Sequence, residues 1–328
     1  MKIALVGSFN LADGYLGAAK ALERLNYKVE FVPAQLYKSE HPESHVAMVM
    51  ADLVKINPDI VLWWRAETMS HVDFKLMRSK VNGKFIMYSW DDPFQWECHK
   101  EMPQKCKILD VAFSCCEDSV KNYIANGCKK AVYCPPGFDP SIHYPEEDEN
   151  YKCDISIVCT NLYDDDIHKL TIFPHLSRKK LLDLIIEKVP EVDLRIYGSE
   201  NFSNYYGDQY KGWINFNESR KVFHNSKISL CTHIRPDGDK YINERVTQVL
   251  GSKGLLLVDH VKGIDSILKP NDECVVIDFS SEENFVNQIK DMMSWSDEKI
   301  NKIKENGHKY AIENLSWDSW AKTVTDNI

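Results

Sequence analysis

Residues 240–259 read KYINERVTQVLGSKGLLLVD, and this stretch decides the fold class. A polar, charged helix start leads through a turn bounded by Gly251 and Gly254 into the apolar run LLLV, which is typical of a buried strand. A helix that leads directly into a buried strand is one step of a βαβ chain, the repeating unit of parallel sheets. The stretch therefore predicts an α/β protein.

Short runs rich in Val and Ile alternate with amphipathic stretches along most of the 328 residues. We expect strands at 2–6, 28–32, 59–64, 84–88, 111–114 and 131–134, and again at 154–159, 193–197, 227–231, 255–259 and 275–278. The pattern breaks after 135–137, and the acidic segment PEEDEN at 145–150 indicates a hinge or linker. The sequence thus predicts an α/β chain of two doubly wound parallel-sheet domains that face each other across a cleft, with a boundary at 145/146.

The composition is that of a soluble globular protein, with 44% hydrophobic and 27% charged residues. The formal net charge is −9, so there is no bulk basic signature for nucleic acid. No run approaches the roughly 18 consecutive apolar residues that span a bilayer, and residues 1–7 are expected to form a buried first strand rather than a secretory signal. The ten cysteines contain no C-x-x-C pair, which favours reduced thiols in a cytoplasmic protein.

Ligands of open parallel sheets bind beyond the carboxyl ends of the strands, so residues after each strand are candidates. The segment GSFNLADGYLG at 7–17, which contains Gly14, forms either a simple strand-to-helix turn or a substrate loop, and it does not match G-x-G-x-x-G. The segment WWRAE at 63–67 is either a sugar-contacting wall or an Arg–Glu surface pair over core Trp residues.

Two adjacent carboxylates, Asp91 and Asp92, follow the strand at 84–88 and precede a proline. One of them can act as a general base while the other hydrogen-bonds the backbone or caps the next helix. The alternative is that both only cap that helix. We take the pair as the candidate catalytic site of the first domain.

Candidate groups for a diphosphate lie in the second half of the chain. Arg178 and Lys179 begin a helix, where they either reach a diphosphate or are simply solvated. Near the start of the helix in 240–251, Arg245 and the helix N-terminal amides favour an anion. The other candidates for the donor are Tyr197 and Gly198 at a strand end, Trp213 and Ile214 in a loop that can pack on a nucleobase, Lys240 and Tyr241 at the helix start, and Asn243 and Gln248 as neutral hydrogen-bonding groups for a ribose or sugar.

The chain resembles the CgeB-like, spore-maturation branch of GT-B glycosyltransferases almost from end to end. The segments that carry the resemblance are SWDDP at 89–93, PPGFDP at 135–140 with YP at 144–145, IYG at 196–198, VFHNSKI at 222–228, and NER at 243–245 with GLLL at 254–257. The resemblance implies an acceptor domain at 1–145, a nucleotide-sugar donor domain at 146–312, and a helix at 313–328 that crosses back to the first domain. Gln248 stands where related enzymes usually carry a Glu that bonds the donor ribose.

Together these observations predict a hexosyl or pentosyl transferase that moves a sugar from a nucleotide-diphosphate sugar to an unidentified hydroxyl on a glycan, protein, small molecule or modified nucleic acid. We expect no metal or other cofactor, because Arg245, Arg178 and helix amides supply fixed positive charge. The acidic residues at 164–166 form a run, and the D-x-D sequence at 237–239 precedes a helix, so neither is a D-x-D motif on a suitable turn. The alternative is that Asp237 and Asp239 bind a divalent ion. The alternatives are a non-catalytic nucleotide-sugar-binding protein and a nucleotide-sugar epimerase or oxidoreductase on a similar two-domain fold.

Overall fold

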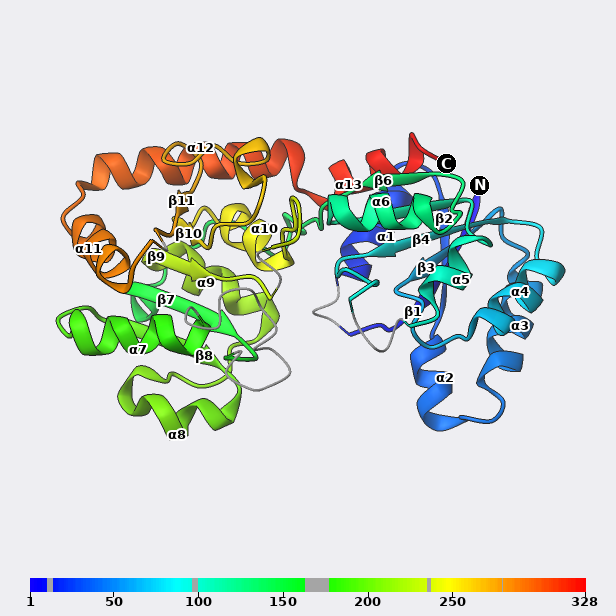
Figure 1. Cartoon of the computed structure of the whole chain (residues 1–328), viewed down its shortest axis with the longest axis horizontal. Helices are drawn as coiled ribbons and strands as arrows, with labels where there is room; N and C mark the ends of the chain where they lie inside the picture. The colour runs from blue at the N-terminus through cyan, green and yellow to red at the C-terminus, as the bar shows by residue number, and fades with distance from the viewer. Residues whose placement is uncertain (11–13, 96–99, 163–176, 235–236, 279) are drawn as a thin grey trace. The chain divides into compact units, whose positions relative to one another are not determined.

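The structure is a computed structural model that describes residues 1–10, 14–95, 100–162, 177–234, 237–278 and 280–328 (Figure 1). The chain divides into two compact units. Unit 1 is residues 1–137 with 317–328, and unit 2 is residues 138–316. The chain enters unit 2 before the expected boundary at 145/146, because the Phe138 N–H already donates to Leu315 O (3.0 Å) and the Phe138 ring packs against Gly251.

Unit 1 is built on a six-stranded parallel sheet in the order β2-β1-β3-β4-β5-β6. Its strands are β1 (Lys2–Gly7), β2 (Lys28–Val32), β3 (Ile60–Trp64), β4 (Lys84–Ser89), β5 (Val111–Ser114) and β6 (Ala131–Tyr133). Its helices are α1 (Tyr15–Arg24), α2 (Ala34–Glu40), α3 (His45–Ile56), α4 (His71–Lys80), α5 (Met102–Cys106), α6 (Glu117–Ala125) and α13 (Trp317–Thr325). The strand order changes direction between β1 and β3, which is the topological switch point where ligands of such sheets bind.

The sheet of unit 1 is buried on both faces. Successive residues of a strand point to opposite faces, so Trp63 and Trp64 of β3 belong to two different core clusters. Trp317 and Trp320 of α13 pack against Trp64, with ring centroids 5.8 and 5.7 Å away. A Cβ added to Gly17 of α1 would lie 2.3 Å from Trp317, so α1 approaches α13 closely only because Gly17 has no side chain. Helix α13 therefore completes the core of unit 1.

Unit 2 repeats this plan with five parallel strands in the order β11-β10-β9-β7-β8. The strands are β7 (Cys153–Cys159), β8 (Leu194–Gly198), β9 (Ser226–Cys231), β10 (Leu256–Val258) and β11 (Val275–Val276). The helices are α7 (Arg178–Lys188), α8 (Ser203–Tyr206), α9 (Ser219–Asn225), α10 (Glu244–Gly251), α11 (Glu282–Met293) and α12 (Asp297–Asn314). The switch point of this sheet lies between β7 and β9.

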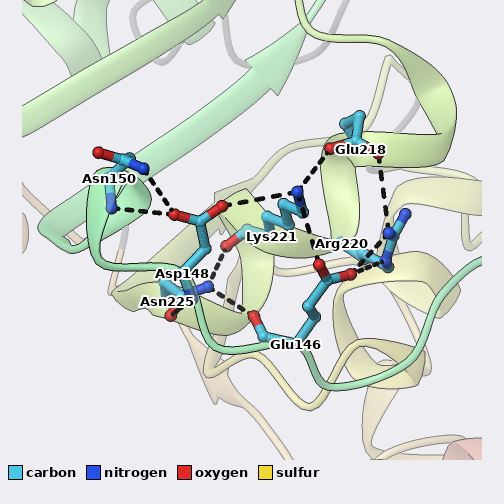
Figure 2. A network of polar contacts seen from close by, with 7 residues as sticks. All are labelled: Glu146, Asp148, Asn150, Glu218, Arg220, Lys221 and Asn225. Atoms are coloured by element: carbon cyan, nitrogen blue, oxygen red, sulfur yellow. Dashed lines mark hydrogen bonds and ion pairs between the residues drawn. The ribbon is translucent and has the colours of Figure 1, made fainter.

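The acidic segment at 145–150 is held against α9 and does not form the expected hinge or linker (Figure 2). Glu146 pairs with Arg220 at 2.6 Å, and Lys221 lies 3.5 Å from carboxylate oxygens of both Glu146 and Asp148. Asn225 donates to Glu146 O (2.8 Å) and accepts from the Asp148 N–H (3.0 Å). The segment is acidic because it faces two basic residues of α9, and composition alone did not distinguish this from a solvated linker.

No helix in the described part of the chain is both long enough and apolar enough to cross a membrane. All nine cysteines that the structure describes are free thiols, and eight of them are buried.

Candidate functional site

The switch point of unit 2 is bridged by Arg178, the first residue of α7. Its guanidinium donates to Asn161 O after β7, and to Thr232 Oγ1 (2.9 Å) and Thr232 O (3.1 Å) after β9. Only 7% of Arg178 is exposed. The Arg178 side chain therefore ties the carboxyl ends of two neighbouring strands together, and three of its hydrogen bonds are made to protein oxygens.

Asn243 fixes the start of α10 at this edge of the sheet. Its Oδ1 accepts from the N–H groups of Arg245 (3.0 Å) and Val246 (3.2 Å), and its Nδ2 donates to Thr232 O (3.1 Å). The helix thus begins at Glu244, after Lys240 and Tyr241, which were expected at its start. Asn243 was expected to bond a ribose or sugar, but its side chain serves as the helix N-cap.

Arg245 is the second residue of α10 and lies beside the same edge. Its guanidinium donates to Gln248 Oε1 (2.9 Å) and lies 5.6 Å from the centroid of the Phe223 ring. Burial, together with the charge of Arg178, lowers the pKa of Arg245. Because the Gln248 amide is neutral, it does not offset the guanidinium charge.

The effect of this charge is visible at His143, which is 1% exposed. Burial, followed by the charges of Arg245 and Arg220, lowers the pKa of His143 to about 3. Burial alone disfavours the charged imidazolium, and the two guanidinium groups add a repulsion, so their own contribution to the potential at His143 is positive. The carboxyl edge of unit 2 is therefore electrostatically suited to an anion.

Lys179 lies beside Arg178 and lines a pocket of about 280 Å³. The Lys179 ammonium lies 2.6 Å from Asp183 Oδ2 and 5.7 Å from the centroid of the Tyr205 ring. The pocket is lined by Thr160, Asn161, Leu162, Lys179, Asn201, Phe202 and Tyr205. It opens beyond the ends of β7 and β8, so Lys179 and Asn161 can both contact a ligand there.

The end of β8 depends on Gly198. A Cβ added there would lie 1.8 Å from Cys159 O of β7, which no side chain permits. Its N–H donates to Gly212 O (3.0 Å), so the loop at 210–214 runs along β8. The indole of Trp213 is 68% exposed in this loop, Ile214 is partly buried, and Tyr197 is 5% exposed. Trp213 is therefore the most exposed aromatic group in this loop.

The segment before α10 is anchored by buried groups. Lys240 has a φ of 57°, in the left-handed region, and its N–H donates to Lys262 O (2.7 Å). Tyr241 is 3% exposed, and its ring centroid lies 5.6 Å from that of His233.

Within the described residues, no group of three His, Cys, Asp or Glu side chains could hold a metal ion. Asp239 lies 3.6 Å from the Lys262 ammonium, and the acidic run at 164–166 lies outside the described residues.

In unit 1 the two candidate carboxylates differ in exposure and in the groups that they contact. Asp92 is 4% exposed and accepts hydrogen bonds from the Phe94 N–H (3.0 Å) and the Ser119 hydroxyl (2.9 Å). The Asp91 side chain is 24% exposed, and its Oδ2 lies 3.7 Å from Nη2 of Arg65. Asp92 holds the turn after β4 in place, and Asp91 is the carboxylate that a substrate can reach.

Two further expectations for unit 1 have different outcomes. Trp63 and Trp64 are 1% and 0% exposed, so they form no sugar-contacting wall, and the alternative of an Arg–Glu pair over core Trp residues is confirmed. Strand β3 is central in the sheet, and both its faces are covered. Gly14 precedes α1 with a φ of 67°, so it provides a left-handed turn, while residues 11–13 lie outside the described residues.

Comparison with known proteins identifies the fold of the chain. Residues 178–326 match the model of a family described as glycosyl transferase-like. The chain has the GT-B fold. Among curated proteins, none is detectably similar in sequence to this chain.

Three GT-B structures illustrate the likeness. Sucrose-phosphate synthase from Thermosynechococcus elongatus is 10% identical with a TM-score of 0.68, covering 99% of this chain and 98% of that one. Anabaena HepE in complex with UDP and glucose is 9% identical with a TM-score of 0.69, at 99% and 98% coverage. A UDP-forming trehalose-phosphate synthase from Burkholderia xenovorans is 11% identical with a TM-score of 0.67, at 99% and 98% coverage. The similarity to these structures is one of fold, and the similarity to a glycosyl transferase-like family covers residues 178–326.

One pair of residues at the edge of unit 2 was not anticipated. His233 follows β9, Asp259 follows β10, and the His233 Nδ1 lies 2.6 Å from Asp259 Oδ1. The His233 N–H also donates to Asp259 Oδ2 (2.8 Å), and both side chains are buried. Each residue comes directly after a strand, which was the available signal, but only the strand order β10-β9 shows that they meet. The pair fixes the backbone next to Thr232, on which Arg178 and Asn243 converge.

Proposed function

We propose that the protein is a glycosyltransferase that moves a sugar from a nucleotide-diphosphate sugar to a hydroxyl of a glycan, protein, small molecule or modified nucleic acid. The observation that carries this proposal is the pair of guanidinium groups at the switch point of unit 2. Arg178 and Arg245 raise the potential of one edge of the sheet, and Arg245 contacts a neutral amide there. A diphosphate offsets this repulsion and gains charge-assisted hydrogen bonds.

The donor residues of this proposal are those at the edge of unit 2. Arg245 is partly buried and remains accessible, so it is assigned the most direct contact with the phosphates. Lys179 lines the adjacent pocket and Trp213 is exposed for a nucleobase. UDP-glucose is the first donor to test, because HepE is a GT-B structure that holds it.

The proposed chemistry divides between the two units. Asp91 accepts the proton of the acceptor hydroxyl as its oxygen forms a bond to the anomeric carbon of the sugar. The bond from that carbon to the diphosphate breaks, and the departing negative charge is stabilised by Arg245 and by the positive potential of the edge. We propose that fixed protein charge does this without a metal ion.

Two finer assignments belong to the same proposal. Membership of the CgeB-like branch rests on the segments that resemble it, above all NER at 243–245 with GLLL at 254–257. A cytoplasmic location is supported by the free thiols, because such thiols persist where the environment is reducing.

Calorimetric titration with UDP-, GDP-, ADP-, dTDP- and CMP-sugars in the presence of EDTA tests the donor assignment. We expect one of the four nucleoside-diphosphate sugars to bind and its nucleoside diphosphate to be released when an acceptor is added, whereas the CMP-sugar, which carries a single phosphate, should not bind. Binding of NADH in place of every nucleotide sugar would support an oxidoreductase. Binding without release in the presence of mixed acceptors would support a non-catalytic binding protein. Activity that EDTA abolishes and Mn²⁺ restores would overturn metal independence.

A further inference from the structure

A charged cluster lies beside the switch point of unit 1, at the carboxyl ends of β3 and β4. We define the edge cluster as Arg65, Glu67 and Asp91. Arg65 and Glu67 follow β3, Asp91 follows β4, and the two strands are paired with Trp64 opposite Tyr88. The Arg65 N–H donates to Tyr88 O (3.1 Å), which fixes the backbone of the cluster to β4. In such sheets this edge is where a ligand binds.

The guanidinium of Arg65 is held between two carboxylates and an aromatic ring. Its Nε lies 3.1 Å from Glu67 Oε1, and its Nη2 lies 3.7 Å from Asp91 Oδ2. The guanidinium carbon lies 5.0 Å from the centroid of the Trp90 ring. The side chains of Arg65, Glu67 and Asp91 keep 27%, 23% and 24% of their exposure, so the cluster is ordered and still accessible to a ligand.

The edge cluster has a net charge of −1 when its members are ionised. Two buried charges beside it are of opposite sign and leave this balance unchanged. Lys105 lies beneath, with its ammonium donating to Ala66 O (2.7 Å), and Asp92 is bound by Ser119. Arg65 is therefore already neutralised by protein carboxylates, unlike Arg245, whose partner is an amide.

From this contrast we infer that the edge cluster binds the acceptor and that the acceptor is an uncharged sugar or polyol rather than a sugar phosphate. This inference rests on the proposed transferase function. Carboxylate oxygens accept hydrogen bonds from hydroxyls and the guanidinium donates to them, so the cluster offers both halves of a hydroxyl's bonding. A phosphate dianion would lie next to a net negative charge and would have to displace Glu67 or Asp91 from Arg65.

A set of matched acceptors tests the inference with the full chain and the nucleotide sugar that binds. Glucose, mannose and fructose are compared with their 6-phosphates, and release of the nucleoside diphosphate is followed. We expect kcat/KM at least about tenfold higher for a free sugar than for its phosphate. Glu67→Gln should lower kcat/KM for the free sugar and raise kcat/KM for the sugar phosphate. The ratio of the two values should fall by about threefold or more.

The control is Glu30→Gln, which removes a carboxylate from an ion pair with Lys28 elsewhere in unit 1 and should leave the ratio unchanged. The wild-type ratio decides the question even if Glu67→Gln folds poorly, which its melting temperature shows. Preference for a phosphate, an unchanged ratio in folded Glu67→Gln, or no release with any of the six compounds would overturn the inference. If donor binding persists in those cases, the proposed function stands. If no nucleotide sugar binds at all, both fail.

Discussion

The same substitution at the two arginines at the edge of unit 2 should affect different properties, stability at Arg178 and donor binding at Arg245. Arg178 is 7% exposed and donates to Asn161 O and to two oxygens of Thr232. Arg245 is partly exposed and donates to Gln248. Replacing each by Met keeps most of the side-chain volume and removes the charge. We expect Arg178→Met to destabilise the fold and Arg245→Met to weaken donor binding.

The magnitudes follow from the hydrogen bonds that are lost. In Arg178→Met, Asn161 O and Thr232 Oγ1 lose a buried donor at about 1–3 kcal/mol each, while Thr232 O keeps its bond from Asn243. Relief of the repulsion between Arg178 and Arg245 offsets part of this cost, so the free energy of unfolding should fall by about 3 kcal/mol. At about 2–4 °C per kcal/mol, the melting temperature falls by about 6–12 °C. Arg245→Met loses one hydrogen bond but relieves the same repulsion, so the free energy of unfolding changes by no more than about 1 kcal/mol.

The assay combines scanning calorimetry with titration of the nucleotide sugar. Loss of one charge-assisted contact to a phosphate is worth about 1.5–3 kcal/mol, so Arg245→Met should raise the Kd about 10- to 150-fold. An Arg245→Met protein that binds the donor as tightly as the wild type would refute the assignment of this residue to the phosphates. So would a melting temperature that falls more in Arg245→Met than in Arg178→Met.

Three further predictions concern other parts of the chain. The pKa of His143 is about 3 in the folded chain and 6.5 for the free side chain, so between these pH values the unfolded chain binds a proton that the folded chain does not. The free energy of unfolding is therefore highest above about pH 6.5 and decreases as the pH falls towards 3. At 1.36 kcal/mol per pH unit, the wild type should lose about 2 kcal/mol more than His143→Phe between pH 7 and pH 5 in urea unfolding, and equal losses would contradict this. Gly251→Ala places a Cβ 2.4 Å from the Phe138 ring and should lower the free energy of unfolding by about 1–3 kcal/mol. An unchanged melting temperature would contradict this. Asp91→Asn should lower kcat about 100-fold or more with an unchanged donor Kd, whereas an active Asp91→Asn enzyme would exclude this base.

The strands could be predicted from the sequence because each is a short apolar run between polar segments. Strand β2 at 28–32 and strand β5 at 111–114 fall where expected. Short helices such as α2 and α5 were not predicted, since 34–40 and 102–106 are too short to show a helical period. The order of the strands in each sheet could not be predicted from the pattern of apolar runs, because it is set by pairing between residues far apart in the chain.

The candidate site was only partly predictable for a related reason. Position after a strand indicated residues such as Asp91 and Gly198, which the structure places at the carboxyl ends of the strands. The partner of each side chain depends on neighbouring strands, so the sequence did not show that Arg178 bonds Thr232 or that Asn243 caps α10. Nor did it show that Asp91 and Asp92 differ in exposure, because alternate residues of a turn point in different directions.

The central claim is that the positive edge of unit 2 holds an activated sugar by its phosphates. Titration of the nucleoside diphosphate against its own nucleoside, UDP against uridine in the first instance, isolates the phosphate contribution. We predict that the diphosphate binds at least about 100-fold more tightly, equivalent to about 2.7 kcal/mol, and that added salt reduces the difference. Equal affinities for nucleoside and nucleoside diphosphate would contradict it.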